Sequence, residues 1–186
     1  MDASDGGFSI MSELRTNRIV PRDGLPSGTF GGIIQVVQAV KQSVQTININ
    51  SEDDVISATI NLKHASSKVM ICWAITVGRG DDDYGFLKLY EGSSEMTGAH
   101  GNTGTNNRVN CLEAISNRGG GNDDGKLTNR CTGTYIHSPS STSPTIKITA
   151  KCTYGSTVTI NMPGEDVNQP YHMRTASFLH LYELAG

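Results

Sequence analysis

Residues 68–77 read KVMICWAITV, the strongest strand signal in the chain. Successive side chains of a strand point to opposite faces of its sheet. One face of this stretch therefore holds five large apolar side chains: Val69, Ile71, Trp73, Ile75 and Val77. The opposite face is also largely apolar: Met70, Cys72, Ala74 and Thr76. A strand that is apolar on both faces is usually central and covered on both sides. We therefore predict a central strand with an apolar layer against each face.

Shorter strand patterns lie on either side of this stretch. Alternation of apolar and polar residues, or enrichment in β-branched residues, predicts further strands: residues 33–40, 44–49, 55–62, 84–90, 109–115, 145–152, 157–161 and 175–184. The tight turn around Gly155 predicts that residues 145–152 and 157–161 pair as a hairpin. Short strands at regular spacing, without a convincing helix, indicate an all-β fold: an antiparallel β-sandwich that is jelly-roll-like.

The first 30 residues differ from the rest of the chain. Four residues interrupt regular structure there: Pro21, Gly24, Pro26 and Gly28. Only residues 13–20 have the pattern of a short strand. We expect residues 1–30 to be an extended N-terminal arm that makes its contacts with a neighbouring subunit or a larger particle, and residues 31–186 to be the β-sandwich domain. Both Met1 and Met11 are compatible with a translation start.

The composition narrows the possible classes of function. The formal net charge is −3 at pH 7, and only 18% of the residues are charged. No basic surplus is present to attract nucleic acid, and no apolar run approaches the roughly 20 residues that span a bilayer. We therefore expect neither nucleic-acid binding nor membrane insertion. The acidic, Gly-rich start lacks the features of a secretory signal, which favours synthesis in a cytoplasm.

The cysteines show no metal-site spacing. Cys72, Cys111, Cys131 and Cys152 form no CxxC pair, so a zinc module is not indicated. Free thiols are favoured outside an oxidising compartment, although Cys111 and Cys131 flank a Gly-rich loop and are candidates for a disulfide. The acidic turn at residues 81–83 lacks the ligand pattern of a calcium loop. The sequence thus predicts no metal and no cofactor.

Motifs of the common catalytic classes are also missing from the sequence. It contains neither a Gly-x-Ser-x-Gly elbow nor a Gly-Lys-Ser phosphate loop. No sequence feature pairs two acids as glycoside hydrolysis requires. We therefore predict a protein that is not an enzyme and has no catalytic residues.

Five segments of the chain together form a recognisable pattern: MSELRTNRIVPRDG at 11–24, GGIIQVVQ at 31–38, SSKVMI at 66–71, FLKLYEG at 86–92 and FLHLYELAG at 178–186. They resemble small virion structural proteins of cyanophages and other marine phages. The resemblance covers most of the chain except the loops around 98–130. It implies a phage structural protein that is made in the host cytoplasm and resides in the virion. The RTNR at residues 15–18 is similar to tail-fibre modules, which implies a homotrimer that contacts other virion proteins through its arm.

Two long polar loops, residues 92–108 and 117–134, are the candidates for receptor contact. Their Gly and Asn residues expose backbone amide groups, and their arginines suit acidic groups on a polysaccharide. The candidate contact residues in and beside these loops are Tyr84, His100, Asn102, Asn106, Arg108, Arg118, Asn122 and Arg130. We expect both loops to lie at one end of the sandwich and to contact a host surface glycan or protein. The alternative is that they only connect strands.

Three functions remain open at this point. The first is a tail-fibre-type host-attachment component, which the resemblance favours. The second is a capsid decoration or knob protein with the same fold and arm but a much higher copy number. The third is a free carbohydrate-binding module, which rests on the sandwich, the tyrosines and the polar loops, and fold alone does not establish function.

Overall fold

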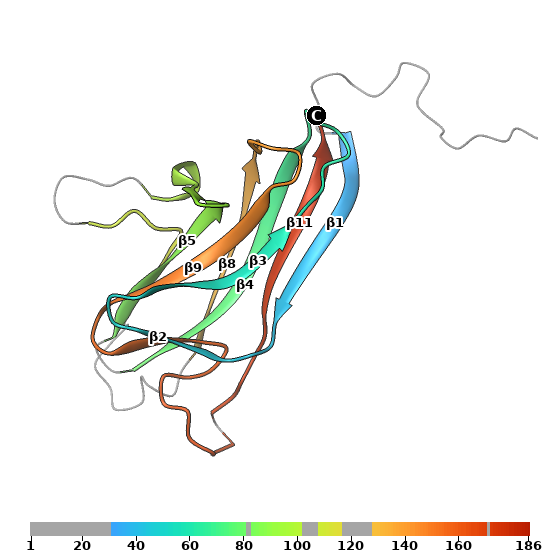
Figure 1. Cartoon of the computed structure of the whole chain (residues 1–186). Coiled ribbons are helices and arrows are strands. Elements are labelled where there is room, and N and C mark those ends of the chain that lie inside the picture. Colours follow the sequence, from blue (N-terminus) through green and yellow to red (C-terminus); the bar gives the residue numbers. More distant parts are fainter. Residues whose placement is uncertain (1–30, 81–82, 102–107, 117–127, 171) are drawn as a thin grey trace, which may run out of the picture.

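A computed structural model describes residues 31–80, 83–101, 108–116, 128–170 and 172–186. Sheet A consists of β1 (Gly31–Lys41), β2 (Gln45–Asn48), β4 (Lys68–Arg79), β8 (Thr128–His137), β10 (Thr157–Ile160) and β11 (Ser177–Ala185). Sheet B consists of β3 (Glu52–Thr59), β5 (Tyr84–Glu91), β6 (Ser94–Glu95), β7 (Glu113–Ile115) and β9 (Thr145–Tyr154). A single 3-10 turn in the described chain, η1 (Thr97–Ala99), follows β6. The strands of each sheet pair antiparallel, and the predicted all-β sandwich is confirmed (Figure 1). The predicted arm, residues 1–30, lies outside the described residues.

β4 is the central strand of sheet A. Residues 69–78 pair with β8 along one edge. Along the other edge, residues 68–74 pair with β11 and residues 77–79 pair with β10. Because both edges of β4 are hydrogen-bonded, the pairing of its residues with those of β8, β10 and β11 determines the alignment of most strands in sheet A.

Only one face of β4 is fully covered by the described chain. The five side chains predicted to share a face are buried against sheet B, and the most exposed of them, Trp73, is 8% exposed. On the opposite face Met70, Cys72 and Ala74 are only half-buried. The central position and the inner layer are therefore confirmed, whereas the described residues supply no second layer over the outer face.

The predicted hairpin around Gly155 is wrong. β9 belongs to sheet B, whereas β10 pairs with β2 and β4 in sheet A. The turn is held from the side by the buried Asp83, whose carboxylate accepts hydrogen bonds from the backbone N–H groups of Ser156 and Gly80. Gly155 has φ +83° and lies so close to Asp83 that a side chain would not fit. This turn therefore carries the chain from one sheet to the other.

Residues 128–134 were expected to belong to a loop but form most of β8. Gly133, which seems to interrupt the strand pattern, is required by the packing: a Cβ there would lie 2.2 Å from Cζ2 of Trp73. In a strand interior, glycine can mark the close approach of a neighbouring group rather than a break. The indole of Trp73 lies over the backbone of β8, so the two strands fit together only with glycine at this position.

Replacing Gly133 tests this contact. Gly133→Ala is expected to lower the free energy of unfolding by about 1–3 kcal/mol, because the added methyl group overpacks a filled site. Gly32→Ala is the matched control, since a Cβ on this other strand glycine of sheet A would meet nothing within 4 Å. Urea unfolding curves of both variants measure the difference, and equal effects would contradict the proposed contact.

A buried carboxylate fixes the loop that leads into β4. Glu183 on β11 is fully buried. It accepts hydrogen bonds from the backbone N–H groups of Lys63 (2.8 Å) and His64 (3.2 Å) and from Nε2 of Gln35 (2.6 Å). Burial alone would raise the pKa of Glu183, but the hydrogen bonds to its carboxylate outweigh burial and lower the pKa. The ionised form of Glu183 thus connects β1 and the residues before β4 to β11.

The lowered pKa of Glu183 predicts acid-dependent stability. A carboxyl group with a lower pKa in the folded state stabilises the fold fully above its unfolded pKa, and this contribution is lost as the pH falls through the folded pKa. The unfolded reference is 4.5. We expect the urea midpoint of the wild-type protein to fall more steeply between about pH 5 and pH 3 than that of Glu183→Gln. The exposed Glu165→Gln is the control, and an unchanged slope in Glu183→Gln would refute this role.

Candidate recognition site

The sandwich has two distinct ends. β1 begins where β11 finishes, because Gly31 pairs with Ala185. We call this the arm end, since residues 1–30 join the domain there. The opposite end, here the distal end, carries the turns after β4 and β9 and the connection of residues 161–176 between β10 and β11. Figure 1 shows the C-terminus at the top and the 161–176 connection at the bottom.

The two polar loops do not share an end. Residues 92–101 leave β5 at the arm end, through the β5–β6 pairing. Residues 117–127 lie outside the described residues, but their flanking strands are fixed at the distal end, where β7 pairs with Gly85 and β8 pairs with Gly78. The expectation of one shared end is wrong because the first loop leaves β5 at the arm end, whereas the short strand β7, antiparallel to β5, directs the chain toward the distal end.

Tyr84 lies at the distal end and is 38% exposed. Its ring meets the ring of Tyr154, which is 63% exposed, edge to face at a centroid distance of 5.8 Å. The two tyrosines come from the paired strands β5 and β9. This pair presents aromatic surface to solvent in a fixed arrangement, which is a common feature of binding surfaces.

His100 serves the local fold rather than a surface contact. Its side chain is fully buried. Nε2 accepts a hydrogen bond from the backbone N–H of Leu89 at 3.0 Å, and Nδ1 lies 2.9 Å from Oε1 of Glu95. These two contacts fix the ring as the neutral tautomer with the proton on Nδ1. Lys88 pairs with the other oxygen of Glu95 at 2.7 Å, so the three side chains hold the β5–β6 turn together.

The two described arginines of the candidate set differ in environment. Arg108 is exposed. Arg130 belongs to β8, where its guanidinium lies 5.3 Å from the centre of the Phe178 ring and donates a hydrogen bond to the carbonyl oxygen of Ala176 at 3.3 Å. Arg130 thus packs on the surface of sheet A instead of projecting from a loop. The other predicted contact residues, Asn102, Asn106, Arg118 and Asn122, lie outside the described residues.

All four cysteines are free thiols in the structure. Cys111 and Cys131, the candidate disulfide pair, are both half-buried. Burial, with a smaller contribution from Glu113, raises the pKa of Cys131 to about 11 and also raises that of Cys111. Thiols with a raised pKa are mostly protonated near neutral pH and are poor nucleophiles.

A buried asparagine forms the base of the 161–176 connection. Asn161 has φ +64°, a conformation that asparagine tolerates better than most residues. Its Nδ2 donates to the carbonyl oxygens of Lys41 (2.8 Å) and Ser43 (3.1 Å), and its Oδ1 accepts from Oγ of Ser177 (2.6 Å). Its backbone N–H donates to the carbonyl oxygen of Thr76. One side chain therefore joins the β1–β2 turn to β11 at the point where the connection begins.

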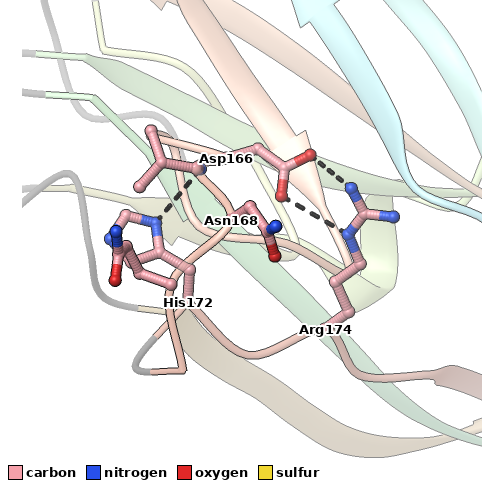
Figure 2. Close-up of a pocket in the computed structure, with 6 residues that line it drawn as sticks. Asp166, Asn168, His172 and Arg174 are labelled. Carbon is pink, nitrogen blue, oxygen red and sulfur yellow. Dashed lines mark hydrogen bonds and ion pairs between the residues drawn. The ribbon is translucent and has the colours of Figure 1, made fainter.

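The connection encloses a polar pocket of about 360 Å³ (Figure 2). We call this site the polar pocket. Its lining residues are Asp166, Val167, Asn168, Gln169, His172 and Arg174. The carboxylate of Asp166 pairs with both Nη2 (2.5 Å) and Nε (3.4 Å) of Arg174. His172 is buried, and its Nδ1 contacts the carbonyl oxygen of Glu165 and the backbone N–H of Val167. These contacts shape a loop that otherwise has no regular structure.

The chemistry of the polar pocket suits a ligand that both donates and accepts hydrogen bonds. The amides of Asn168 and Gln169 do both, the carboxylate of Asp166 accepts, and the guanidinium of Arg174 donates. Arg174 is 60% exposed and Asp166 is 32% exposed, so both are accessible from solvent. Sugar hydroxyl groups have this dual character, and the pocket volume falls in the range of small-ligand sites.

The polar pocket is formed by residues that were not among the predicted contact residues. Residues 163–174 lie between two strands and contain Pro163, Gly164 and Pro170 together with acidic and amide side chains. A long polar connection with this composition indicates a functional loop as strongly as the two loops that were selected. Loop length is therefore the signal in the sequence that indicates this pocket, whereas high Gly and Asn content indicates residues 92–108 and 117–134 instead.

Two classes of site receive no support within the described part of the chain. No three side chains of His, Cys, Asp or Glu come together there as a metal site would require. Over the same residues, no helix is long and apolar enough to cross a membrane.

Comparison with known proteins shows no family for this chain and only distant structural similarity. No protein-family model matches the chain, and no curated protein matches it. Among solved structures it is similar to infectious bursal disease virus, Gx strain, with 11% identity and a TM-score of 0.39 over 88% of this chain and 42% of that chain. It is also similar to the VP2 subviral particle of that virus, with 10% identity and a TM-score of 0.35 over 89% and 44%. The chain spans less than half the length of either, and the fold assignment rests on the strand pairing alone.

The base of the pocket loop gives a stability prediction. Asn161→Ala removes three hydrogen bonds and places alanine at a positive φ, so we expect a loss of about 3 kcal/mol in the free energy of unfolding. Asn161→Gly, which accepts this φ, separates the hydrogen bonds from the backbone conformation. The exposed Asn168→Ala is the control, with an expected change within about 0.5 kcal/mol. Similar urea midpoints for Asn161→Ala and Asn168→Ala would be incompatible with this function of Asn161.

Proposed function

We propose that this chain is a non-enzymatic structural protein of a bacteriophage particle and, more specifically, a tail-fibre-type host-attachment component. The segments that resemble small phage virion proteins support the general assignment. The separation of the arm end from the distal end supports the attachment role. In this proposal the arm contacts other virion proteins, a homotrimer is the functional unit, and the distal end faces the host surface.

The observation that carries the proposal is the distance between the two ends. β4 has 12 residues and runs the length of sheet A. At about 3.4 Å per residue, the ends lie about 40 Å apart. A protein attached to a particle through residues 1–30 would therefore present the turns of the distal end away from its attachment point.

The distal end has the composition of a recognition surface. The Tyr84–Tyr154 pair offers exposed aromatic rings, and the polar pocket offers paired charges and amides. Aromatic faces contact the apolar faces of sugar rings, while amides and charged groups hydrogen-bond the hydroxyl groups. A host surface glycan is therefore the ligand class that this end fits best.

The same features also favour a free carbohydrate-binding module as a second candidate. Binding of the purified chain on a glycan array is expected for both functions, but only the attachment protein would be present in purified particles. Capsid decoration is distinguished by copy number, because a decoration protein occurs in many tens of copies and a fibre protein in few. Quantitative mass spectrometry of purified particles measures both quantities.

Truncation of the tyrosine pair tests the attachment function. Particles that carry Tyr84→Ala with Tyr154→Ala are expected to adsorb to the host at least about tenfold more weakly, because the loss of central aromatic contacts costs about 2 kcal/mol or more. Thr142→Ala, an exposed position at the arm end, is the matched control. Both variants should be incorporated into particles at the wild-type level.

Two outcomes would count against the proposal. Wild-type adsorption of the tyrosine variant, at normal incorporation, would exclude the pair as a host contact. Failure of the wild-type chain to appear in purified particles would exclude a virion protein altogether. Asn168→Ala with Gln169→Ala, tested in the same assay, shows whether the polar pocket contributes separately.

A further inference from the structure

The outer face of sheet A carries an ordered apolar surface. The strand register places its side chains in three rows across β1, β11, β4 and β8. The rows are Val36–Tyr182–Met70–Ile136, Gln38–His180–Cys72–Thr134 and Val40–Phe178–Ala74–Thr132. We call these twelve positions the outer face. Figure 1 shows β1 and β11 side by side along the edge of the domain.

Much of the outer face is exposed, although two of its three rows are largely apolar and only the middle row is mainly polar. Val36 is 52% exposed, Val40 47% and Ile136 44%. Along β11, the ring of His180 stacks near Phe178 at 6.3 Å and lies 6.2 Å from the ring of Tyr182. The outer face therefore has the character of an interface and not of a solvated sheet surface.

The scarcity of charged side chains on the outer face also favours an interface. None of the positions in the three rows is a carboxylate, lysine or arginine, and His180 is the one titratable imidazole among them. The adjacent Arg130 lies over Phe178. A partner therefore meets aromatic rings and aliphatic side chains, and a cation brought by the partner could stack on the ring of Tyr182, whereas Arg130 already covers Phe178.

The size of the outer face limits what can cover it. Rows about 7 Å apart on strands about 4.8 Å apart give roughly 400 Å². A stable interface between two globular proteins takes about 800 Å² from each partner. The outer face is thus too small for a whole domain by itself, and it matches an extended segment of several residues.

Such a segment lies next to this sheet in the chain. The first 30 residues of the sequence join the domain at Gly31, the start of the edge strand β1 of the same sheet. Residues 13–20 read ELRTNRIV, with Leu14, Ile19 and Val20 as apolar side chains and Arg15 and Arg18 as cations. The eleven residues from there to Gly31 can span up to about 36 Å. The residues before Pro21 and Pro26 are biased toward extended backbone, and an extended connection of this length is long enough to reach a neighbouring copy.

We propose that residues 13–20 of a neighbouring copy of this chain lie across the outer face. The apolar side chains of the segment cover Val36 and Ile136, and one of its arginines stacks on the ring of Tyr182, because Arg130 already lies over Phe178. This inference rests on the proposed assembly of several copies in the particle. It adds the surface that receives the arm and explains why β4 is apolar on both faces.

Cys72, in the middle row, provides a direct test because its thiol is native to the outer face. In a full-length chain with Cys111→Ser and Cys131→Ser, Thr16→Cys is expected to form a disulfide with Cys72 of another copy under mild oxidation. The product is a covalent dimer or larger species on a non-reducing gel. The same chain with Cys72→Ala is the control. It should lose the species whose disulfide maps to Cys72 by peptide mass spectrometry, whereas linkage between the introduced cysteines of two arms would persist.

Each result decides the question. Linkage between copies that depends on Cys72 supports the proposal. Linkage within one monomer would show that the arm covers its own sheet, which overturns the contact between copies. Absence of any linkage to Cys72, while sedimentation shows an oligomer, would overturn the outer face as the site of the arm.

A charge placed on the outer face gives an independent measurement. Ile136→Lys is expected to weaken self-association at least about tenfold, because it buries a cation beneath the arm. Ser57→Lys, an exposed strand position on sheet B, should leave association unchanged. Equal sedimentation profiles for the two variants would contradict the proposal. Incorporation into particles, measured separately, tests the proposed function itself and does not depend on this contact.

Discussion

The packing of β4 determines the rest of the structure. Its inner face supplies the largest continuous part of the core, and its two edges pair with β8 on one side and with β11 and β10 on the other. A shift of one residue in this strand would exchange its two faces and move the core side chains to the surface. The indole of Trp73 against the backbone at Gly133 opposes such a shift, because only one position of β8 accepts the ring. The register of sheet A therefore follows from one close contact together with the burial of one face.

Much of the fold could be predicted from the sequence because strand periodicity is a local property. The apolar stretch at 68–77 and the alternation at 145–152 were sufficient for β4 and β9. The errors arose where a distant residue determines the outcome. Gly133 resembled a strand break because Trp73, far away in the sequence, is what requires it. The turn at Gly155 resembled a hairpin because the carboxylate of Asp83, which holds the turn, cannot be recognised from the local sequence.

The candidate site was harder to predict for a related reason. Composition identified polar loops, but it could not distinguish a side chain that projects into solvent from one that is buried in the fold. Among the predicted contact residues, the side chain of His100 is fully buried, whereas Arg130 is exposed but packs on a strand of sheet A. Tyr84 lies at the start of a strand, but its contact with Tyr154 depends on the pairing of β5 with β9 and cannot be read from the local sequence. The polar pocket required the fold, since Asn161 determines the geometry of its loop through contacts with Lys41, Ser43 and Ser177.

The two faces and the two ends of the domain divide its surface by chemistry. The inner faces of the sheets are satisfied within the chain, whereas the outer face of sheet A is apolar without a cover from the described residues. The distal end is polar and aromatic, and it is made of turns whose shape depends on buried groups such as Asp83 and Asn161.

Apolar surface that remains exposed in one copy favours association between copies, because burial of that surface is favourable for any arrangement that removes it from water. The outer face runs along the strands, so association through it would leave the distal ends of the copies uncovered. In a parallel arrangement of copies, these ends would also point the same way. Under the proposed attachment function, several weak contacts of the distal ends with one surface would act together, since linked sites bind a common surface far more tightly than each site alone.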